Sequence, residues 1–198
     1  MDALLSLILF AAVATLSPGG ATTLATACGI RFGYLRSLPL VAGIACGLAT
    51  LVASASVGLG TVLLALPALS LAMKITGSVY LLWLAWKIAR SGSPDRAAAD
   101  DAGPIGFVGG YLLLLINPKA WAMAFGASAS FATVAENPVD LALIMGSVFV
   151  VAASLSLSLW SAGGALLARI IRTDFQWRIL NLLLAVLLAL SILPFWIG

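Results

Sequence analysis

Leu16-Ser17-Pro18-Gly19-Gly20 and Ile116-Asn117-Pro118-Lys119 interrupt two otherwise apolar segments, and their prolines are 100 positions apart. Proline lacks a backbone N–H and its ring clashes with the carbonyl one turn earlier, so a helix arriving at either stretch should kink or stop. The polar residue before each proline, Ser17 or Asn117, is a suitable N-cap, and the proline suits the first position of a new helix. The two stretches therefore predict a pair of broken helices, one unit used twice.

The chain around these stretches has the composition of a membrane protein. It has 198 residues, of which 63% are hydrophobic and 9% charged, whereas soluble domains contain about 25% charged residues. The mean hydropathy is +1.16. A helix needs about 20 apolar residues to cross a bilayer. We therefore expect an all-α integral membrane protein with six transmembrane helices, at about residues 3–30, 38–65, 67–88, 105–134, 141–168 and 179–196.

A polar stretch rich in Ser, Pro, Asp and Ala divides this pattern at about residues 91–104. We expect a single transporter domain over residues 1–198, with a first repeat at about 1–90 and a second at about 105–198. Three spans per repeat is an odd number, so the second repeat begins on the opposite face of the membrane. The prediction is an inverted repeat of three plus three helices, with helices 1 and 4 broken at Pro18 and Pro118.

The basic residues predict the orientation of the chain. If the six spans alternate, one side receives eight basic residues and the other receives none, so the basic side is expected to be cytoplasmic. Both termini then lie outside, on the side that also holds Asp2, Glu136 and Asp140. The eight basic residues are Arg31, Arg36, Lys87, Arg90, Arg96, Arg169, Arg172 and Arg178.

The helix breaks are also the predicted binding site. Two helix N-termini inside the membrane would present unpaired N–H groups and partial positive charge to an anion. Lys119 adds a full charge, which costs about 2.5–3.5 kcal/mol at mid-membrane and usually marks function. The alternative is a structural lysine bound to helix-end carbonyls. The candidate substrate-binding residues are Ser17, Pro18, Gly19, Gly20, Thr22, Thr23, Asn117, Pro118, Lys119 and Trp121.

Three further polar residues are candidates for a pathway or a coupling role. Lys74 lies in the third span, where its long side chain could instead reach toward water. Ser154 and Ser158 are four positions apart on the fifth span, a spacing that also suits contacts between helices. The chain contains no histidine, and Cys28 and Cys46 are interpreted as packing residues. We therefore expect neither a metal site nor a cofactor.

The chain resembles the LysE/RhtB family of amino-acid exporters. The matching stretches are SPG at 17–19, GIRFG at 29–33, GIACG at 43–47, KITGSVYLLWLAWK at 74–87, GF at 106–107 and NPKA at 117–120. Residues 80–88 look most like the branch that exports cysteine and O-acetylserine. The chain departs from the family at Gly20, where a proline is common, and in the fifth span, where residues 154–158 lack the acidic residue of many relatives.

The resemblance implies a bacterial inner-membrane efflux carrier for small amino acids, driven by the proton-motive force. Its partners would be the amino acid and the lipid bilayer, with no nucleic acid, and the sequence leaves monomer and homodimer open. In a carrier, the substrate carboxylate would lie between the two helix N-termini and Lys119. The ammonium group would lie near the carbonyls around Leu16 and Ile116.

Other functions fit parts of the pattern. An intramembrane hydrolase would use Ser17 as the nucleophile and a desolvated Lys119 as the base. The carrier could also move another small solute. A metal exporter is disfavoured because the predicted spans lack histidine and carboxylates, the usual ligands of divalent metals.

Overall fold

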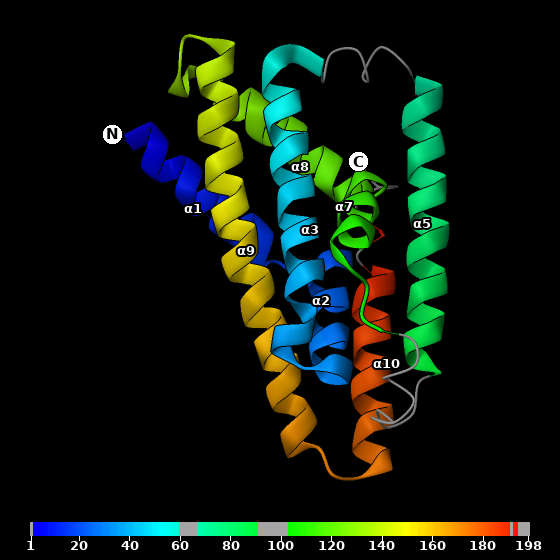
Figure 1. The fold of residues 1–198 in the computed structure, drawn as a ribbon. Helices are drawn as coiled ribbons and strands as arrows, with labels where there is room; N and C mark the ends of the chain where they lie inside the picture. The colour runs from blue at the N-terminus through cyan, green and yellow to red at the C-terminus, as the bar shows by residue number, and fades with distance from the viewer. Residues whose placement is uncertain (1, 60–66, 91–102, 191, 194–198) are drawn as a thin grey trace.

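The computed structural model describes residues 2–59, 67–90, 103–190 and 192–193, and over these residues the chain is helical with no strand, as predicted (Figure 1). The helices α3 and α9 form the centre of the bundle, and α5 pairs with α10. In chain order the elements are α1 (Asp2–Leu16), α2 (Gly20–Phe32), α3 (Tyr34–Ser54), the π-helical η1 (Ala55–Leu59), α5 (Pro67–Ala89), α7 (Phe107–Leu115), α8 (Pro118–Ser130), the 3-10 helix η2 (Ala132–Val134), α9 (Pro138–Ile170) and α10 (Asp174–Leu190).

The chain bends sharply where α7 meets α8. The axes of the two helices differ by 69°. Asn117 is the N-cap of α8, because its side chain accepts a hydrogen bond from the Lys119 N–H at 3.1 Å. Pro118 occupies the first helical position. Both assignments confirm the prediction for this stretch.

The bend between α1 and α2, of 58°, is built differently. The prediction of Ser17 as the N-cap and Pro18 as the first helical residue is wrong, because Gly19 is the N-cap and α2 begins at Gly20. Ser17 still belongs to the last turn of α1, since its hydroxyl donates to the Ala14 carbonyl at 2.7 Å. The Gly19 N–H donates to Thr22 Oγ1 at 2.8 Å.

The predicted span boundaries mark apolar sequence rather than helix ends. The helices begin earlier than expected, α3 at Tyr34 instead of residue 38 and α9 at Pro138 instead of residue 141. Asn137 explains the second difference, because its side chain caps α9 by accepting the Val139 N–H at 2.8 Å. A capped first turn is helical whatever its polarity.

Two helices of the described residues are long and apolar enough to cross a membrane, at Tyr34–Gly58 and Pro138–Ile170. The number rises to four if each bent pair counts as one span. The predicted spans at 67–88 and 179–196 include residues whose side chains or backbone lie outside the described part. The number six therefore stays a prediction.

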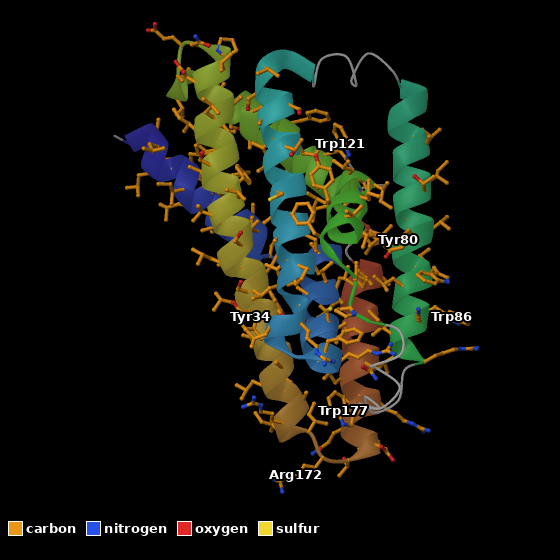
Figure 2. All side chains as sticks on the ribbon, viewed as in Figure 1. Tyr34, Tyr80, Trp86, Trp121, Arg172 and Trp177 are labelled. Atoms are coloured by element: carbon orange, nitrogen blue, oxygen red, sulfur yellow. The ribbon has the colours of Figure 1, made fainter. Side chains whose placement is uncertain are left out.

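One end of the bundle, called the basic end here, collects the basic residues. Helices α2, α5 and α9 end there, and α3 and α10 begin there, at the bottom of Figure 1. Arg172 and Trp177 lie toward this end in Figure 2. The basic residues at these helix ends are Arg31, Arg36, Lys87, Arg90, Arg169, Arg172 and Arg178. Glu136 and Asp140 lie at the start of α9, at the opposite end.

The helices α2 and α9 cross in backbone contact through two glycines. A Cβ on Gly29 would overlap the carbonyl of Ser161, and a Cβ on Gly164 would overlap the carbonyl of Thr26. Each glycine therefore faces the carbonyl three residues before the other glycine. Ser161 is fully buried at this crossing, and its hydroxyl has no hydrogen-bond partner among the residues that the structure describes.

The helices α3 and α7 cross in the same way. A Cβ on Gly43 would overlap the carbonyl of Phe107, and a Cβ on Gly110 would lie 2.6 Å from the carbonyl oxygen of Leu40. The pattern of each glycine facing the carbonyl three residues before its partner is thus repeated. Small residues let helix backbones approach to this distance. The first crossing lies near the end of α2 and the second at the start of α7, and both of these helix ends are directed toward the basic end (Figure 1).

Candidate functional site at the two helix breaks

Lys119 joins the two helix breaks. It lies in the first turn of α8, and its ammonium group donates hydrogen bonds to Ser17 Oγ at 2.7 Å, Pro18 O at 3.1 Å and Ser17 O at 3.3 Å. These acceptors sit at the C-terminal end of α1, where the helix dipole favours a cation. The contact is the one that the structural interpretation of Lys119 anticipated.

The charge of Lys119 is nevertheless not neutralised by these partners. An ammonium group has three N–H donors, and all three acceptors given for Lys119 are uncharged oxygens. Two of these contacts are longer than 3 Å. A carboxylate would replace them with shorter, charge-assisted hydrogen bonds, which are about twice as strong as neutral ones. The site can therefore exchange a carbonyl for an anion.

The start of α2 lies next to this ammonium group, and its N-cap, Gly19, has no side chain to cap the first N–H groups of the helix, although the Gly19 N–H itself is paired with Thr22 Oγ1. A Cβ on Gly19 would be 3.1 Å from Lys119 Nζ, so the N-cap of α2 approaches the charge closely at a residue that has no side chain. Helix starts leave N–H groups without an intrahelical partner. The start of α8, in contrast, is capped by Asn117. Of the two helix starts, α2 is therefore the one that is open to an anion.

A cavity, called the Lys119 cavity here, lies between α1, α2, α3, α7, α8 and α9. One wall of it is polar and carries Lys119. The remaining wall is apolar and includes Leu48, Met123, Ala153 and Leu157. No His, Asp or Glu is among its lining residues. The predicted site residues that line it are Ser17, Gly19, Gly20, Thr22, Asn117 and Lys119.

Four other predicted binding residues do not line this cavity. Pro18 contributes only its carbonyl, as an acceptor for Lys119. Thr23 is 4% exposed, and Pro118 lies against Gly77 of α5. Trp121 donates its indole N–H to the Leu115 carbonyl at 2.6 Å, across the bend between α7 and α8. Thr23, Pro118 and Trp121 therefore occupy structural positions beside the site.

The proposed pathway serines, Ser154 and Ser158, are not among the lining residues of the cavity either. The serine between them was missed: Ser156 is 2% exposed and donates to the Thr15 carbonyl at 2.8 Å. The indole N–H of Trp160 likewise donates to the Leu16 carbonyl, at 3.2 Å. Both donors satisfy carbonyls that the end of α1 leaves without helix partners. The side chain of Lys74 lies outside the described residues.

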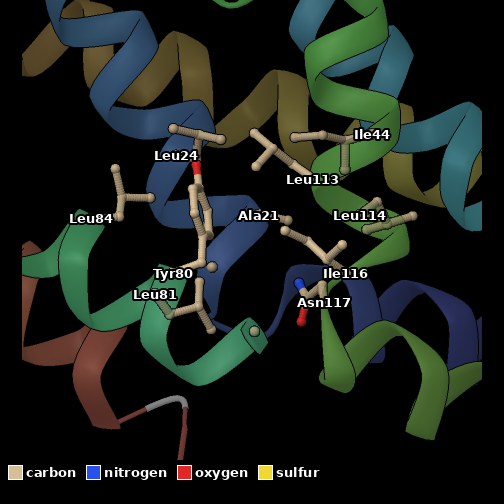
Figure 3. Close-up of a pocket in the computed structure, with 12 residues that line it drawn as sticks. Ala21, Leu24, Ile44, Tyr80, Leu81, Leu84, Leu113, Leu114, Ile116 and Asn117 are labelled. Atoms are coloured by element: carbon tan, nitrogen blue, oxygen red, sulfur yellow. The ribbon is translucent and has the colours of Figure 1, made fainter. Parts of the chain in front are cut away.

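A second cavity, called the Tyr80 cavity here, lies between α2, α3, α5 and α7 (Figure 3). The two cavities share Gly20, Ala21, Ile44, Leu114 and Asn117, so they are neighbours at the level of the helix breaks. The Tyr80 cavity was not predicted. Its other lining residues are Leu24, Gly77, Tyr80, Leu81, Leu84, Leu113 and Ile116.

Comparisons with known proteins agree with the resemblance noted in the sequence. A family model described as LysE type translocator matches residues 12–193. A cysteine/O-acetylserine efflux protein of Salmonella typhimurium (strain LT2) is 27% identical over 177 residues, covering 89% of this chain and 88% of the relative. A protein of the same description from Escherichia coli (strain K12) is 27% identical over 179 residues, with the same coverage. No solved structure matches the chain.

Proposed function

The chain belongs to the LysE family of translocators, and from this membership we propose that it exports small uncharged amino acids, sulfur-containing ones included, by alternating access. A translocator is a transport protein and not an enzyme, so the Ser17/Lys119 hydrolase is set aside. The relatives described as cysteine/O-acetylserine efflux proteins support an amino acid as the cargo. The linings of the Lys119 cavity and of the Tyr80 cavity support an uncharged side chain, because no carboxylate lines either of them to pair with a basic one.

The observation that carries the proposal is the position of Lys119 beside the uncapped start of α2. We place the substrate carboxylate there, between the Lys119 ammonium group and the first N–H groups of α2. When Lys119 turns to the carboxylate, it leaves the carbonyls of Ser17 and Pro18 without a donor. The substrate ammonium group takes these carbonyls. Binding is thus an exchange of partners, in which each charge of the zwitterion is matched.

This placement refines the initial hypothesis, in which both helix starts shared the anion. The cap that Asn117 provides to α8 supports a single site at α2. The refined placement also puts the substrate ammonium group at the carbonyls of Ser17 and Pro18 instead of those near Leu16. The Leu16 carbonyl already accepts the Trp160 indole N–H.

For the topology we propose six spans in an inverted repeat, in the bacterial inner membrane, with the basic end in the cytoplasm and both termini outside. The positive-inside rule supports this orientation. The helices α1 and α2 run toward the basic end, whereas α7 and α8 run away from it (Figure 1). Opposite directions are what an inverted repeat requires of its two broken helices.

For the transport cycle we propose that the two glycine crossings are the cytoplasmic gate, closed in this conformation. Both crossings bring backbones into contact, and such contacts separate as a unit because packed interfaces have discrete arrangements. The buried hydroxyl of Ser161 supports opening at α2 and α9, since water would supply the hydrogen bond that it lacks. With no carboxylate at the Lys119 cavity, coupling to protons would use the Lys119 amine itself.

The experiment that tests the proposal is counterflow of radiolabelled amino acids in proteoliposomes, with and without an imposed pH gradient. The panel contains cysteine, O-acetylserine, serine, threonine and lysine. We expect exchange of the small uncharged amino acids by the wild type, no exchange by Lys119→Met, and normal exchange by Lys87→Met. The last variant removes a lysine that stacks over Trp83 on α5. Well-inserted wild-type protein that exchanges none of these amino acids would refute the proposal.

A further inference from the structure

The Tyr80 cavity is apolar except at two points. Asn117 lies at one end of it, at the boundary with the Lys119 cavity, and the hydroxyl of Tyr80 points toward Leu24 at the other (Figure 3). The ring of Tyr80 is held by Trp83, one turn further along α5, at a centroid distance of 5.9 Å. Among the described residues the Tyr80 hydroxyl has no hydrogen-bond partner. Leucine and isoleucine side chains form most of the wall between these two points.

The two cavities meet where the substrate head group is placed. Gly20 belongs to both, and a Cβ there would lie 2.8 Å from Leu81 Cδ2 and 3.8 Å from Asn117 Nδ2. The start of α2 therefore comes close to α5 and to Asn117 only because residue 20 has no side chain. A carboxylate bound at the start of α2 places the α-carbon of the amino acid at this boundary, with the Tyr80 cavity directly beyond it.

We infer that the Tyr80 cavity receives the side chain of the transported amino acid and that the Tyr80 hydroxyl selects for a side chain with an uncharged hydrogen-bonding end, such as a hydroxyl, a thiol or an ester. This inference rests on the proposed function. A hydrogen-bonding end would give the Tyr80 hydroxyl a partner, whereas an alkyl end would leave it unpaired in an apolar space. The leucine wall excludes a charged end, which would lose its hydration without a counter-charge.

Competition in the counterflow assay tests the inference. Proteoliposomes of each variant exchange labelled serine. Unlabelled O-acetylserine and norleucine, an alkyl analogue of similar length, are tested separately as competitors of this exchange. We expect the wild type to prefer O-acetylserine and Tyr80→Phe to reduce the ratio of the two inhibition constants about tenfold, the usual effect of one hydrogen bond. Tyr111→Phe is the matched control, because Tyr111 stacks on Phe107 and lines neither cavity.

A change of volume provides a second test. Leu113→Phe narrows the Tyr80 cavity alone, and Met123→Phe narrows the Lys119 cavity alone. We expect Leu113→Phe to weaken inhibition by both long competitors more than it weakens the exchange of the shorter serine. An unchanged ratio in Tyr80→Phe, or a loss of long competitors in Met123→Phe and not in Leu113→Phe, would overturn the inference and leave the exporter standing. Absence of any exchange by the wild type would instead remove the proposed function and the inference together.

Discussion

Lys119 Nζ lies 2.7 Å from Ser17 Oγ although the two residues are 102 positions apart, so one hydrogen bond joins the two helix breaks. It is the shortest of the three contacts of the ammonium group. Because the proposed substrate must draw the ammonium group away from these partners, the strength of this contact should set the affinity for substrate.

Ser17→Ala removes this hydroxyl and leaves the two carbonyl contacts of Lys119 in place. We expect the apparent KM for exchange to fall several-fold, since Lys119 gives up less when it turns to a carboxylate. The protein should lose about 1–2 kcal/mol of stability, because the hydroxyl makes two hydrogen bonds, one to the Ala14 carbonyl and one from Lys119. Counterflow kinetics and thermal unfolding in detergent measure the two effects. A rise in KM would mean that the Ser17 hydroxyl binds the substrate directly.

Asn117→Ala removes the side-chain cap of α8, and Asn137→Ala is its matched control at α9. In both positions the asparagine accepts the N–H two residues later and precedes a proline. Each variant should lose about 1 kcal/mol of stability, the typical cost of an N-cap. We expect only Asn117→Ala to impair exchange, because only Asn117 lines the two cavities. Equal transport defects would show that Asn117 acts through helix stability alone.

The two breaks differ in how much of them the local sequence predicts. An Asn-Pro pair has one good cap and one good first residue, so the start of α8 follows from four consecutive residues. Ser-Pro-Gly-Gly offers several candidate caps. What decides among them is the attachment of Ser17 to Ala14 and to Lys119, and the second of these contacts comes from the other half of the chain. No local pattern contains that information.

The same limit applies to side chains on long helices. Serines at 154, 156 and 158 alternate in the sequence, but a helix turns once in 3.6 residues, so Ser154 and Ser158 share one face and Ser156 points away from it. Which one is buried depends on where α1 lies. Tyr80 was recognised only as part of a family-like stretch, because the cavity that it enters is formed by four separate helices. The basic end, in contrast, could be predicted from the sequence, because the positions of charged residues along the chain do not depend on which helices pack together.

Gly29→Ala should prevent the crossing of α2 and α9 from closing, because the added Cβ would overlap the Ser161 carbonyl. We expect a shift toward the conformation open at the basic end. Gly163→Ala is the control, since nothing lies within 4 Å of the Cβ that it adds. Cys28 is 5% exposed on α2 and reports on the opening. In a Cys46→Ala background, a membrane-impermeant thiol reagent on the side of the basic end should label Cys28 several-fold faster in Gly29→Ala.

Unchanged labelling and unchanged exchange in Gly29→Ala would mean that this crossing is not the gate. Slow labelling with lost exchange would mean instead that the crossing is needed for folding. Gly43→Ala repeats the test at the crossing of α3 and α7, where the added Cβ would overlap the Phe107 carbonyl. A gate made of both crossings requires the same direction of change in the two variants.

Ser156→Ala distinguishes a structural serine from a pathway serine on α9. Ser156 donates to the Thr15 carbonyl, whose usual helix partner, the Gly19 N–H, is engaged by Thr22. Removing the donor leaves a buried carbonyl unpaired, which costs about 1–3 kcal/mol. We expect this loss in thermal unfolding, whereas Ser158→Ala, whose side chain lines neither cavity, should stay within about 0.5 kcal/mol of the wild type.

If Ser154 and Ser158 form the pathway as first predicted, Ser158→Ala must slow exchange without changing stability. The face of α9 that meets α1 carries Ser156 and Trp160 and not Ser158. We therefore expect Ser158→Ala to transport at the wild-type rate.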